Sequence, residues 1–256
     1  MAYQPSGFWE KRLQDHFSLV GTGRVSFSPW YNRWLYRAKR RGLQKVWDTL
    51  GISPAGKRVL DIGCGTGFFV AYYQEQGATV TGIDITQISV ETLRQRFPQF
   101  TFYQRDIGSA WEEMLPPFDL VHVFDVLYHL TGAAQFAQAL HNIGRLTRPG
   151  GYVLLTDAAG QATYTPAPHV TFRSLATYQE RLAENGLSLL LVVPLYHFLN
   201  RRLFSRSSSQ STTRWARLAR WLDDAGAPLW YGLDGLFLSA NRANMRLLVA
   251  QKQENT

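Results

Sequence analysis

The chain of 256 residues is 45% hydrophobic and 18% charged, which suits one α/β domain and argues against a disordered chain. Its single cysteine, Cys64, excludes an intramolecular disulfide and a cysteine-cluster metal site, and it suits a reducing cytoplasm. We expect no signal peptide, because the N-terminus lacks an apolar core of the required length. We expect no membrane-spanning helix, because no stretch holds the roughly 18 uninterrupted apolar residues that a span needs.

The net charge of +8 is unevenly distributed along the chain. Residues 1–50 carry a net charge of +6, residues 51–194 of −3 and residues 195–256 of +5. Basic flanks of this kind suit a phosphate, an anionic membrane or nucleic acid, and equally an ordinary basic surface.

Residues 1–50 predict an N-terminal helical cap, in which Ser28-Pro29 is a typical helix start. On the helix that follows, Trp34, Leu35, Ala38 and Gly42 are expected to face a sheet. The basic residues of this segment are expected to point outward, namely Arg33, Arg37, Lys39, Arg40 and Arg41.

From about residue 58, short apolar runs alternate with helical patterns. Seven strands are predicted, at Arg58–Ile62, Ala78–Ile83, Phe100–Gln104, Phe118–Phe124, Tyr152–Thr156, Leu187–Val193 and Met245–Gln251. Helices are predicted at Phe68–Gly77, Gln87–Phe97, Ala133–Leu146 and Arg173–Asn185. This alternation indicates a mostly parallel sheet with helices on both faces, whose strands end at one edge, where ligands bind.

The last two strands are separated by an insert at about residues 195–243. Within it, Ser205–Thr213 is expected to be a flexible loop, and Thr212–Leu222 an amphipathic helix with Trp215, Leu218 and Leu222 on one face. Such a basic helix either packs on its own domain as a lid or contacts an anionic membrane. The lid is favoured, because one short amphipathic helix binds a membrane only marginally.

The strongest motif is VLDIGCGTG at Val59–Gly67, a buried strand that runs into glycines and then a helix. Glycines let the backbone turn tightly and approach a ligand, and a helix start offers free amides. Further segments follow in order: Gly82-Ile83-Asp84, Arg105-Asp106-Ile107, Phe118-Asp119-Leu120 leading to Asp125–Leu130, and Leu146–Gly151.

With these segments, residues 57–160 resemble the class I S-adenosylmethionine-dependent methyltransferases. The resemblance is to the branch that includes quinone-biosynthesis and other small-molecule methyltransferases. It implies a Rossmann-like domain over residues 51–256 and S-adenosylmethionine as cofactor.

The resemblance also implies a role for each motif residue. The loop of Gly63, Cys64, Gly65 and Gly67 would hold the methionine end, with Asp61 near its ammonium group. Asp84, followed by Ile85, would bind the ribose hydroxyls, Asp106 and Ile107 the adenine, and Asp125 would lie where cofactor and acceptor meet. The structural alternatives are a plain turn for the glycines and Asp106, and a helix cap for Asp84 and Asp125.

If the acceptor is a hydroxyl, a base helps to remove its proton, and His129 is the best candidate. His129 is equally open to a packing role, and His169 is a weaker choice of base. Tyr31 and Tyr128 are placed near the acceptor. No histidine pair has metal-ligand spacing, so no metal is expected.

The favoured function is methyl transfer to a small molecule, preferably to oxygen. A lipid-linked or membrane-associated substrate and RNA remain alternatives, although no nucleic-acid-binding module is recognisable. A nicotinamide-dependent dehydrogenase would need G-x-G-x-x-G, whose last position, counted from Gly63, is Phe68 here. A cofactor-binding protein without turnover also stays open, as does the oligomeric state.

Overall fold

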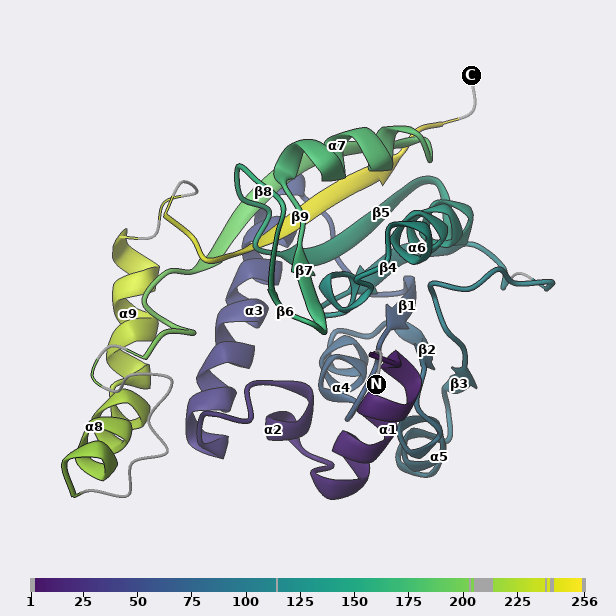
Figure 1. Cartoon of the computed structure of the whole chain (residues 1–256). Coiled ribbons are helices and arrows are strands. Elements are labelled where there is room, and N and C mark those ends of the chain that lie inside the picture. Colours follow the sequence, from purple (N-terminus) through teal and green to yellow (C-terminus); the bar gives the residue numbers. More distant parts are fainter. Residues whose placement is uncertain are drawn as a thin grey trace.

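The computed structural model describes residues 3–113, 115–202, 204, 214–237, 239 and 242–254. Its centre is a seven-stranded sheet in the order β3-β2-β1-β4-β5-β9-β8 (Figure 1). The strands are β1 (Arg58–Ile62), β2 (Thr79–Asp84), β3 (Thr101–Gln104), β4 (Phe118–Val123), β5 (Thr147–Asp157), β8 (Leu187–Tyr196) and β9 (Met245–Lys252). Strands β1 to β5 pair in parallel, and β9 is antiparallel to both its neighbours. The predicted fold class is therefore confirmed.

Two layers of helices bury the two faces of the sheet. On one face lie α3 (Pro29–Leu50), α4 (Phe68–Glu75) and α5 (Gln87–Arg96), and on the other lie α6 (Ala133–Leu146) and α7 (Leu175–Ala183). Burying these apolar faces is the main force that holds the layers together. The predicted elements recur with boundaries shifted by a few residues, and β5 begins five residues before the predicted strand.

Short elements surround the sheet edge, two of them inside the predicted N-terminal cap, and none was assigned individually from the sequence. They are α1 (Pro5–Asp15), α2 (Leu19–Thr22), the 3-10 turn η1 (Leu127–His129), and a hairpin of β6 (Tyr164–Ala167) and β7 (Val170–Phe172). Helix α1 packs against α5 through a polar contact. Gln87 is the first residue of α5, and its backbone N–H donates to one carboxylate oxygen of Glu10 at 2.7 Å. Glu10 therefore caps a helix whose own Thr86 side chain does not cap it.

Helix α3 begins where the sequence predicted it, with the Ser28 hydroxyl accepting the N–H of Tyr31 at 3.2 Å. Its predicted inner face is buried at Leu35, Ala38 and Gly42, whereas Trp34 is half-buried. A Cβ on Gly42 would lie 2.3 Å from Leu195, so the glycine permits α3 to approach β8 closely.

The prediction that Lys39 points outward is wrong. Its side chain is only 3% exposed, because it lies on the inner face of α3 and pairs with Asp125.

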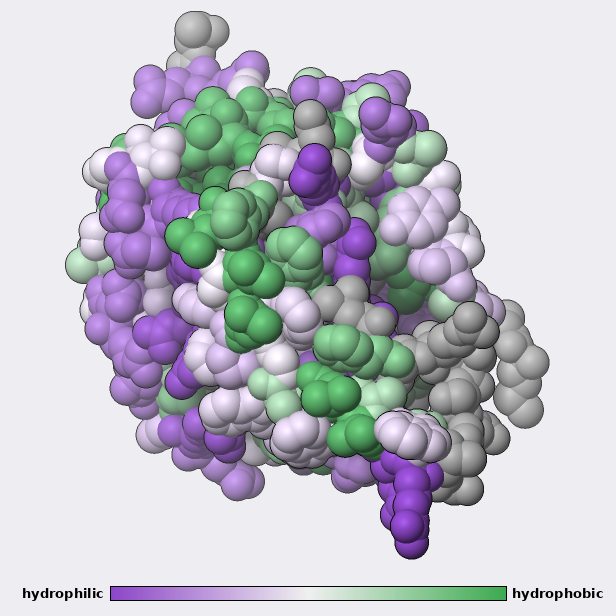
Figure 2. Space-filling view, turned by 90° about the vertical axis from the view of Figure 1, so that its left-hand side faces the viewer, coloured by the Kyte–Doolittle hydropathy of each residue, from purple (hydrophilic) through white to green (hydrophobic). Residues whose placement is uncertain are grey.

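The insert between β8 and β9 contains α8 (Arg214–Ala225) and α9 (Ala227–Phe237), and α9 packs against α3 (Figure 1). The loop predicted at Ser205–Thr213 lies outside the described residues. Apolar side chains gather on the face that these helices present to solvent (Figure 2). Within the described part of the chain, no helix is long and apolar enough to cross a bilayer.

Candidate functional site

The glycine loop joins β1 to α4 in a conformation that favours glycine. Gly63 has φ +73° and Gly65 has φ +49°. A Cβ on Gly63 would lie 2.3 Å from a methyl group of Val126. The backbone N–H of Gly63 donates to the carbonyl of Ile83 at 2.8 Å, which fixes the loop against β2. Neither a side chain nor an ordinary backbone conformation fits at this turn.

Asp84, at the end of β2, ties the loop to the next helix. One of its carboxylate oxygens accepts the N–H of Gly65 at 2.8 Å, and the other accepts the N–H and hydroxyl of Thr86 at 2.9 and 2.6 Å. Burial raises the pKa of Asp84, although these hydrogen bonds act in the opposite direction. The carboxylate is thus held rigidly, with its remaining lone pairs at the sheet edge.

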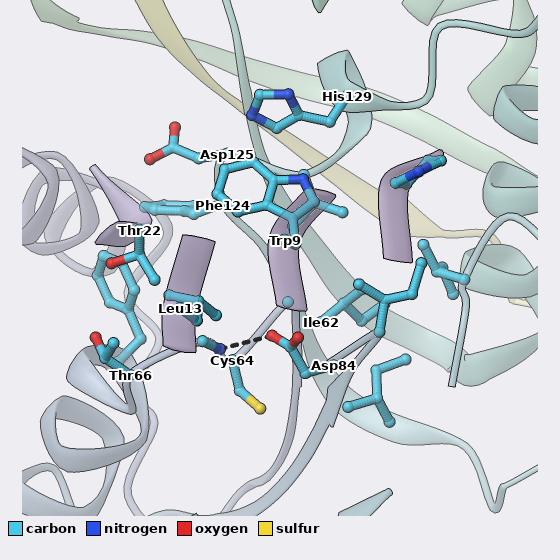
Figure 3. A pocket seen from close by; sticks show the side chains of 18 of the residues that line it. Trp9, Leu13, Thr22, Ile62, Cys64, Thr66, Asp84, Phe124, Asp125 and His129 are labelled. Atoms are coloured by element: carbon cyan, nitrogen blue, oxygen red, sulfur yellow. Dashed lines mark hydrogen bonds between the residues drawn. The ribbon is translucent and has the colours of Figure 1, made fainter. Parts of the chain in front are cut away.

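A cavity of about 120 Å³ lies above this loop, and we call it the loop cavity. In Figure 3, Asp84 and Cys64 lie on one side of Trp9, and Asp125 and His129 on the other. The predicted site residues that line it are Gly63, Cys64, Gly65, Asp84, Ile85, Asp106, Ile107, Asp125 and His129. The structure therefore brings most of the predicted site to one place, from four different strand ends.

Two predicted cofactor residues do not line the loop cavity. Asp61 is buried beneath the loop. Its carboxylate forms a hydrogen bond of 2.8 Å with Nδ1 of His122, on the neighbouring strand β4. Gly67 is the N-cap of α4, and a Cβ on it would lie 2.5 Å from Leu93. Both residues support the loop from within the domain.

Asp125 follows β4 with φ +60°, a strained conformation for a residue with a side chain. Its backbone N–H donates to the Thr156 hydroxyl at 2.8 Å, and that hydroxyl donates to the Asp125 carboxylate at 3.2 Å. Lys39 of α3 forms a buried ion pair with the other oxygen. Burial raises the pKa of Asp125, but the charge of Lys39 and hydrogen bonds outweigh it, so the pKa is lowered. Asp125 is thus a fixed carboxylate in the wall of the cavity.

His129, in η1, has a defined tautomer. Its Nδ1 lies 2.8 Å from the carbonyl oxygen of His169, and a carbonyl can only accept, so Nδ1 carries the proton. Burial lowers the pKa of His129 to about 4, against the opposing effect of that hydrogen bond. The indole of Trp9 packs edge-on at a centroid distance of 4.8 Å. The neutral ring therefore offers Nε2 as an acceptor.

A second cavity, of about 290 Å³, adjoins the first, and we call it the second cavity. Tyr128, which was predicted near the acceptor, lines this cavity. Tyr31 lines neither cavity, since it is fully buried, stacks on Phe27 and accepts the N–H of Asn200 at 3.0 Å. The residues that line both cavities are Trp9, Thr22, Tyr36, Asp125 and His129. These five mark the place where the two spaces meet.

Several site residues were not singled out from the sequence. Trp9, Thr22 and Tyr36 come from α1 to α3, which carry no motif, and Lys39 was assigned to the wrong face. Helical spacing gave one usable signal, because Tyr36 and Lys39 lie on the same side of α3 as Leu35 and Gly42. No described residue of α8 or α9 lines either cavity, whereas Tyr196 and Asn200, at the start of the predicted insert, line the second one. Residues of α1 and α2 line both cavities, and the lid role of the insert stays a prediction. Among the described side chains, no cluster of three histidine, cysteine or acidic groups is arranged to hold a metal ion.

Comparison with known proteins places this geometry in context. A family model described as "Methyltransferase domain" matches residues 31–231. Ubiquinone biosynthesis O-methyltransferases of Paracidovorax citrulli and Pseudomonas aeruginosa are 34% identical over 112 residues and 39% identical over 106 residues. These matches cover 41% and 40% of this chain, and 46% and 44% of the relatives. The chain thus aligns with about half the length of the curated relatives it matches.

Solved structures share the fold at low sequence identity. The magnesium protoporphyrin IX methyltransferase of Synechocystis, solved with bound S-adenosylmethionine, has a TM-score of 0.59 at 17% identity, covering 98% of this chain and 99% of that one. The 1,6-didemethyltoxoflavin-N1-methyltransferase of Burkholderia thailandensis has a TM-score of 0.56 at 17% identity, covering 85% and 79%.

Proposed function

This chain belongs to the methyltransferase family and is of the class I S-adenosylmethionine-dependent kind, and we propose that it transfers the methyl group to a hydroxyl oxygen of a small molecule. The observation that carries this proposal is the junction of the two cavities, where Asp125 and His129 line both. A cofactor in one cavity and an acceptor in the other would meet beside a carboxylate and a neutral imidazole.

The loop cavity fits the chemistry of S-adenosylmethionine. Fixed carboxylates at Asp84 and Asp106 suit the ribose diol and the adenine amino group, while Ile62, Ile83 and Ile107 offer apolar walls. Asp125 suits the ammonium group of the methionine end, because its carboxylate lines the loop cavity. Asp61 does not line this cavity and is paired with His122 instead. When bound, the cofactor supplies an electrophilic methyl group on a sulfonium.

In this proposal the chain contributes alignment, exclusion of water and one proton acceptor. Nε2 of His129 takes the proton of the acceptor hydroxyl as the oxygen becomes nucleophilic. The His169 carbonyl keeps Nδ1 protonated and holds the ring in place. Trp9, packed on His129, covers the junction from α1.

The test is His129→Asn, which keeps an N–H donor near the Nδ1 position and removes Nε2. We expect cofactor affinity within about twofold of wild type and kcat lower by about 100-fold or more, the usual contribution of a general base. The matched control is His141→Asn, an exposed histidine of α6. A kcat within threefold of wild type would show that His129 is not the base.

The insert suggests where a membrane-associated acceptor would be met. On α8 and α9, large apolar side chains are exposed, including Trp215 (79%), Trp221 (63%), Leu236 (79%) and Phe237 (67%). Asp223 and Asp234 of the same helices are buried, while Arg214 and Arg217 are exposed. We propose that this apolar and basic face (Figure 2) contacts an anionic membrane surface from a cytoplasmic location.

Flotation with phosphatidylglycerol vesicles and with phosphatidylcholine vesicles tests this face. Wild type should float with the anionic vesicles, and Trp215→Ser/Trp221→Ser should lose at least half of that binding. Tyr164→Ser, at an exposed aromatic residue of β6, serves as the control. Equal recovery of the double variant and wild type would rule out this contact surface.

A further inference from the structure

Basic side chains outnumber acidic ones in the second cavity. Arg12, Arg24, Lys39 and Asp125 are the charged residues among the described side chains that line it, leaving the histidines aside. Asp125 is the only carboxylate of that set, and Lys39 already pairs with it. The two arginines therefore give this cavity an excess of positive charge.

Arg12 is positioned by the backbone and retains free donors. Its Nε donates to the carbonyl of Gly21 at 2.7 Å, and one Nη donates to the carbonyl of Gly23 at 2.8 Å. A guanidinium has five N–H groups, so these bonds leave three. Within the described residues no carboxylate lies in ion-pair distance of Arg12.

Arg24 lines the same cavity, and its backbone is fixed by Asn32. Its N–H donates to the Asn32 side-chain oxygen at 2.8 Å, and its carbonyl accepts from the Asn32 amide at 3.0 Å. The side chain has no ion pair among the described residues, and its guanidinium lies 5.8 Å from the centre of the Phe27 ring. Burial lowers the pKa of Arg12, and the nearby positive charge of Arg24 acts in the same direction. Arg12 and Arg24 line the same cavity, the latter with an exposed side chain, and two guanidinium groups at one cavity suit an anion.

Arg12 is linked to His129 through one aromatic ring. The guanidinium carbon of Arg12 lies 4.8 Å from the Trp9 ring centre, and that ring lies 4.8 Å from His129. Trp9, Tyr36, Tyr128 and Phe172 add aromatic walls to the same cavity. Such walls suit a flat ring bound between the arginines and the base.

We propose that the acceptor is an aromatic acid, whose anionic group, a carboxylate or a phosphate, binds Arg12 and Arg24 while its hydroxyl faces His129. This inference rests on the proposed function, because it assigns the acceptor to the cavity beside the cofactor. It adds the class of acceptor, which the methyl-transfer geometry alone does not specify.

The first test is binding, which does not require turnover. With S-adenosylhomocysteine present, the affinities of 3,4-dihydroxybenzoate, its methyl ester and catechol phosphate are measured by calorimetry. We expect both anions to bind at least about tenfold more tightly than the neutral ester, as charge-assisted hydrogen bonds would give. The preference for the anions should fall as salt concentration rises.

Arg24→Gln is the informative variant, since the Arg24 side chain makes no hydrogen bond with the residues that the structure describes. We expect it to lose most of the preference for the anions while its melting temperature stays unchanged. Arg12→Lys keeps a charge but not the fork of donors, and should lose part of the preference. Arg33→Gln, at an exposed arginine of α3 that lines neither cavity, should behave as wild type.

The outcomes separate the two claims. Equal affinity for the acid and its ester, in a protein that binds S-adenosylhomocysteine, would overturn the anionic acceptor and leave methyl transfer standing. An anion preference that Arg24→Gln and Arg12→Lys both retain would overturn the assignment to these residues. Preference for the anions with no methyl transfer to any probe would support the anion site and count against the proposed transfer.

Discussion

Lys39→Met should destabilise the fold, although lysine and methionine side chains have similar length. It leaves the Asp125 carboxylate, which is 17% exposed, without its charged partner. Among the described side chains, Thr156 and Tyr128 remain as its hydrogen-bond donors. Removing one member of a buried pair typically costs about 3–5 kcal/mol. For a domain of this size about 1 kcal/mol shifts the melting temperature by roughly 2–4 °C, so a decrease of about 6–20 °C is expected.

The assay is thermal unfolding followed by circular dichroism at neutral pH and moderate salt. Lys45→Met is the matched control, since Lys45 is exposed on the same helix, and it should melt within about 2 °C of wild type. Adding Asp125→Asn to Lys39→Met removes the unpaired charge and should recover at least half of the loss, because asparagine tolerates a positive φ. If Lys39→Met melts like the Lys45→Met control, the ion pair does not stabilise the fold and the reasoning fails.

Three further changes test other parts of the site. Gly63→Ala should weaken S-adenosylmethionine binding at least tenfold, because φ is +73° and the new Cβ would clash with Val126. Calorimetry compares it with Gly232→Ala, which has open space around the new Cβ and should bind like wild type. Glu10→Ala removes the cap of α5 and should raise the KM for the cofactor several-fold with kcat nearly unchanged, and an unaltered KM would show that α1 needs no such contact. The pKa of His129 is depressed from 6.5 to about 4, so wild type should lose stability relative to His129→Asn as pH falls through that interval. Parallel pH profiles of the two melting temperatures would contradict the buried neutral histidine.

The fold and the loop could be predicted from the sequence because their signals are local. A buried strand, glycines that need positive φ and a helix start occupy the nine residues Val59–Gly67, and the order of strand ends brings Asp84, Asp106 and Asp125 to one sheet edge. The resemblance to a family then assigned roles that spacing alone could not.

What the sequence could not show depends on contacts between distant segments. Asp61 belongs to the glycine-loop motif, but its side chain pairs with His122, which lies 61 residues later in the chain. That pairing depends on the register between β1 and β4. Lys39 lies in a run of basic residues, and only the position of α3 against the sheet shows that it is buried opposite Asp125. Tyr31 and Tyr36 lie in the same aromatic and basic stretch of sequence. In the folded helix, Tyr31 is buried in the core, whereas Tyr36 lines both cavities. The domain boundary at residue 50 and the cytoplasmic localisation stay predictions.

The most direct test of the central claim is label transfer from methyl-labelled S-adenosylmethionine in a fractionated cell extract. Purified protein should place label in the small-molecule or lipid fraction, and His129→Asn should abolish most of it while still binding the cofactor. Label confined to RNA or protein, or no label despite cofactor binding, would contradict methyl transfer to a small molecule.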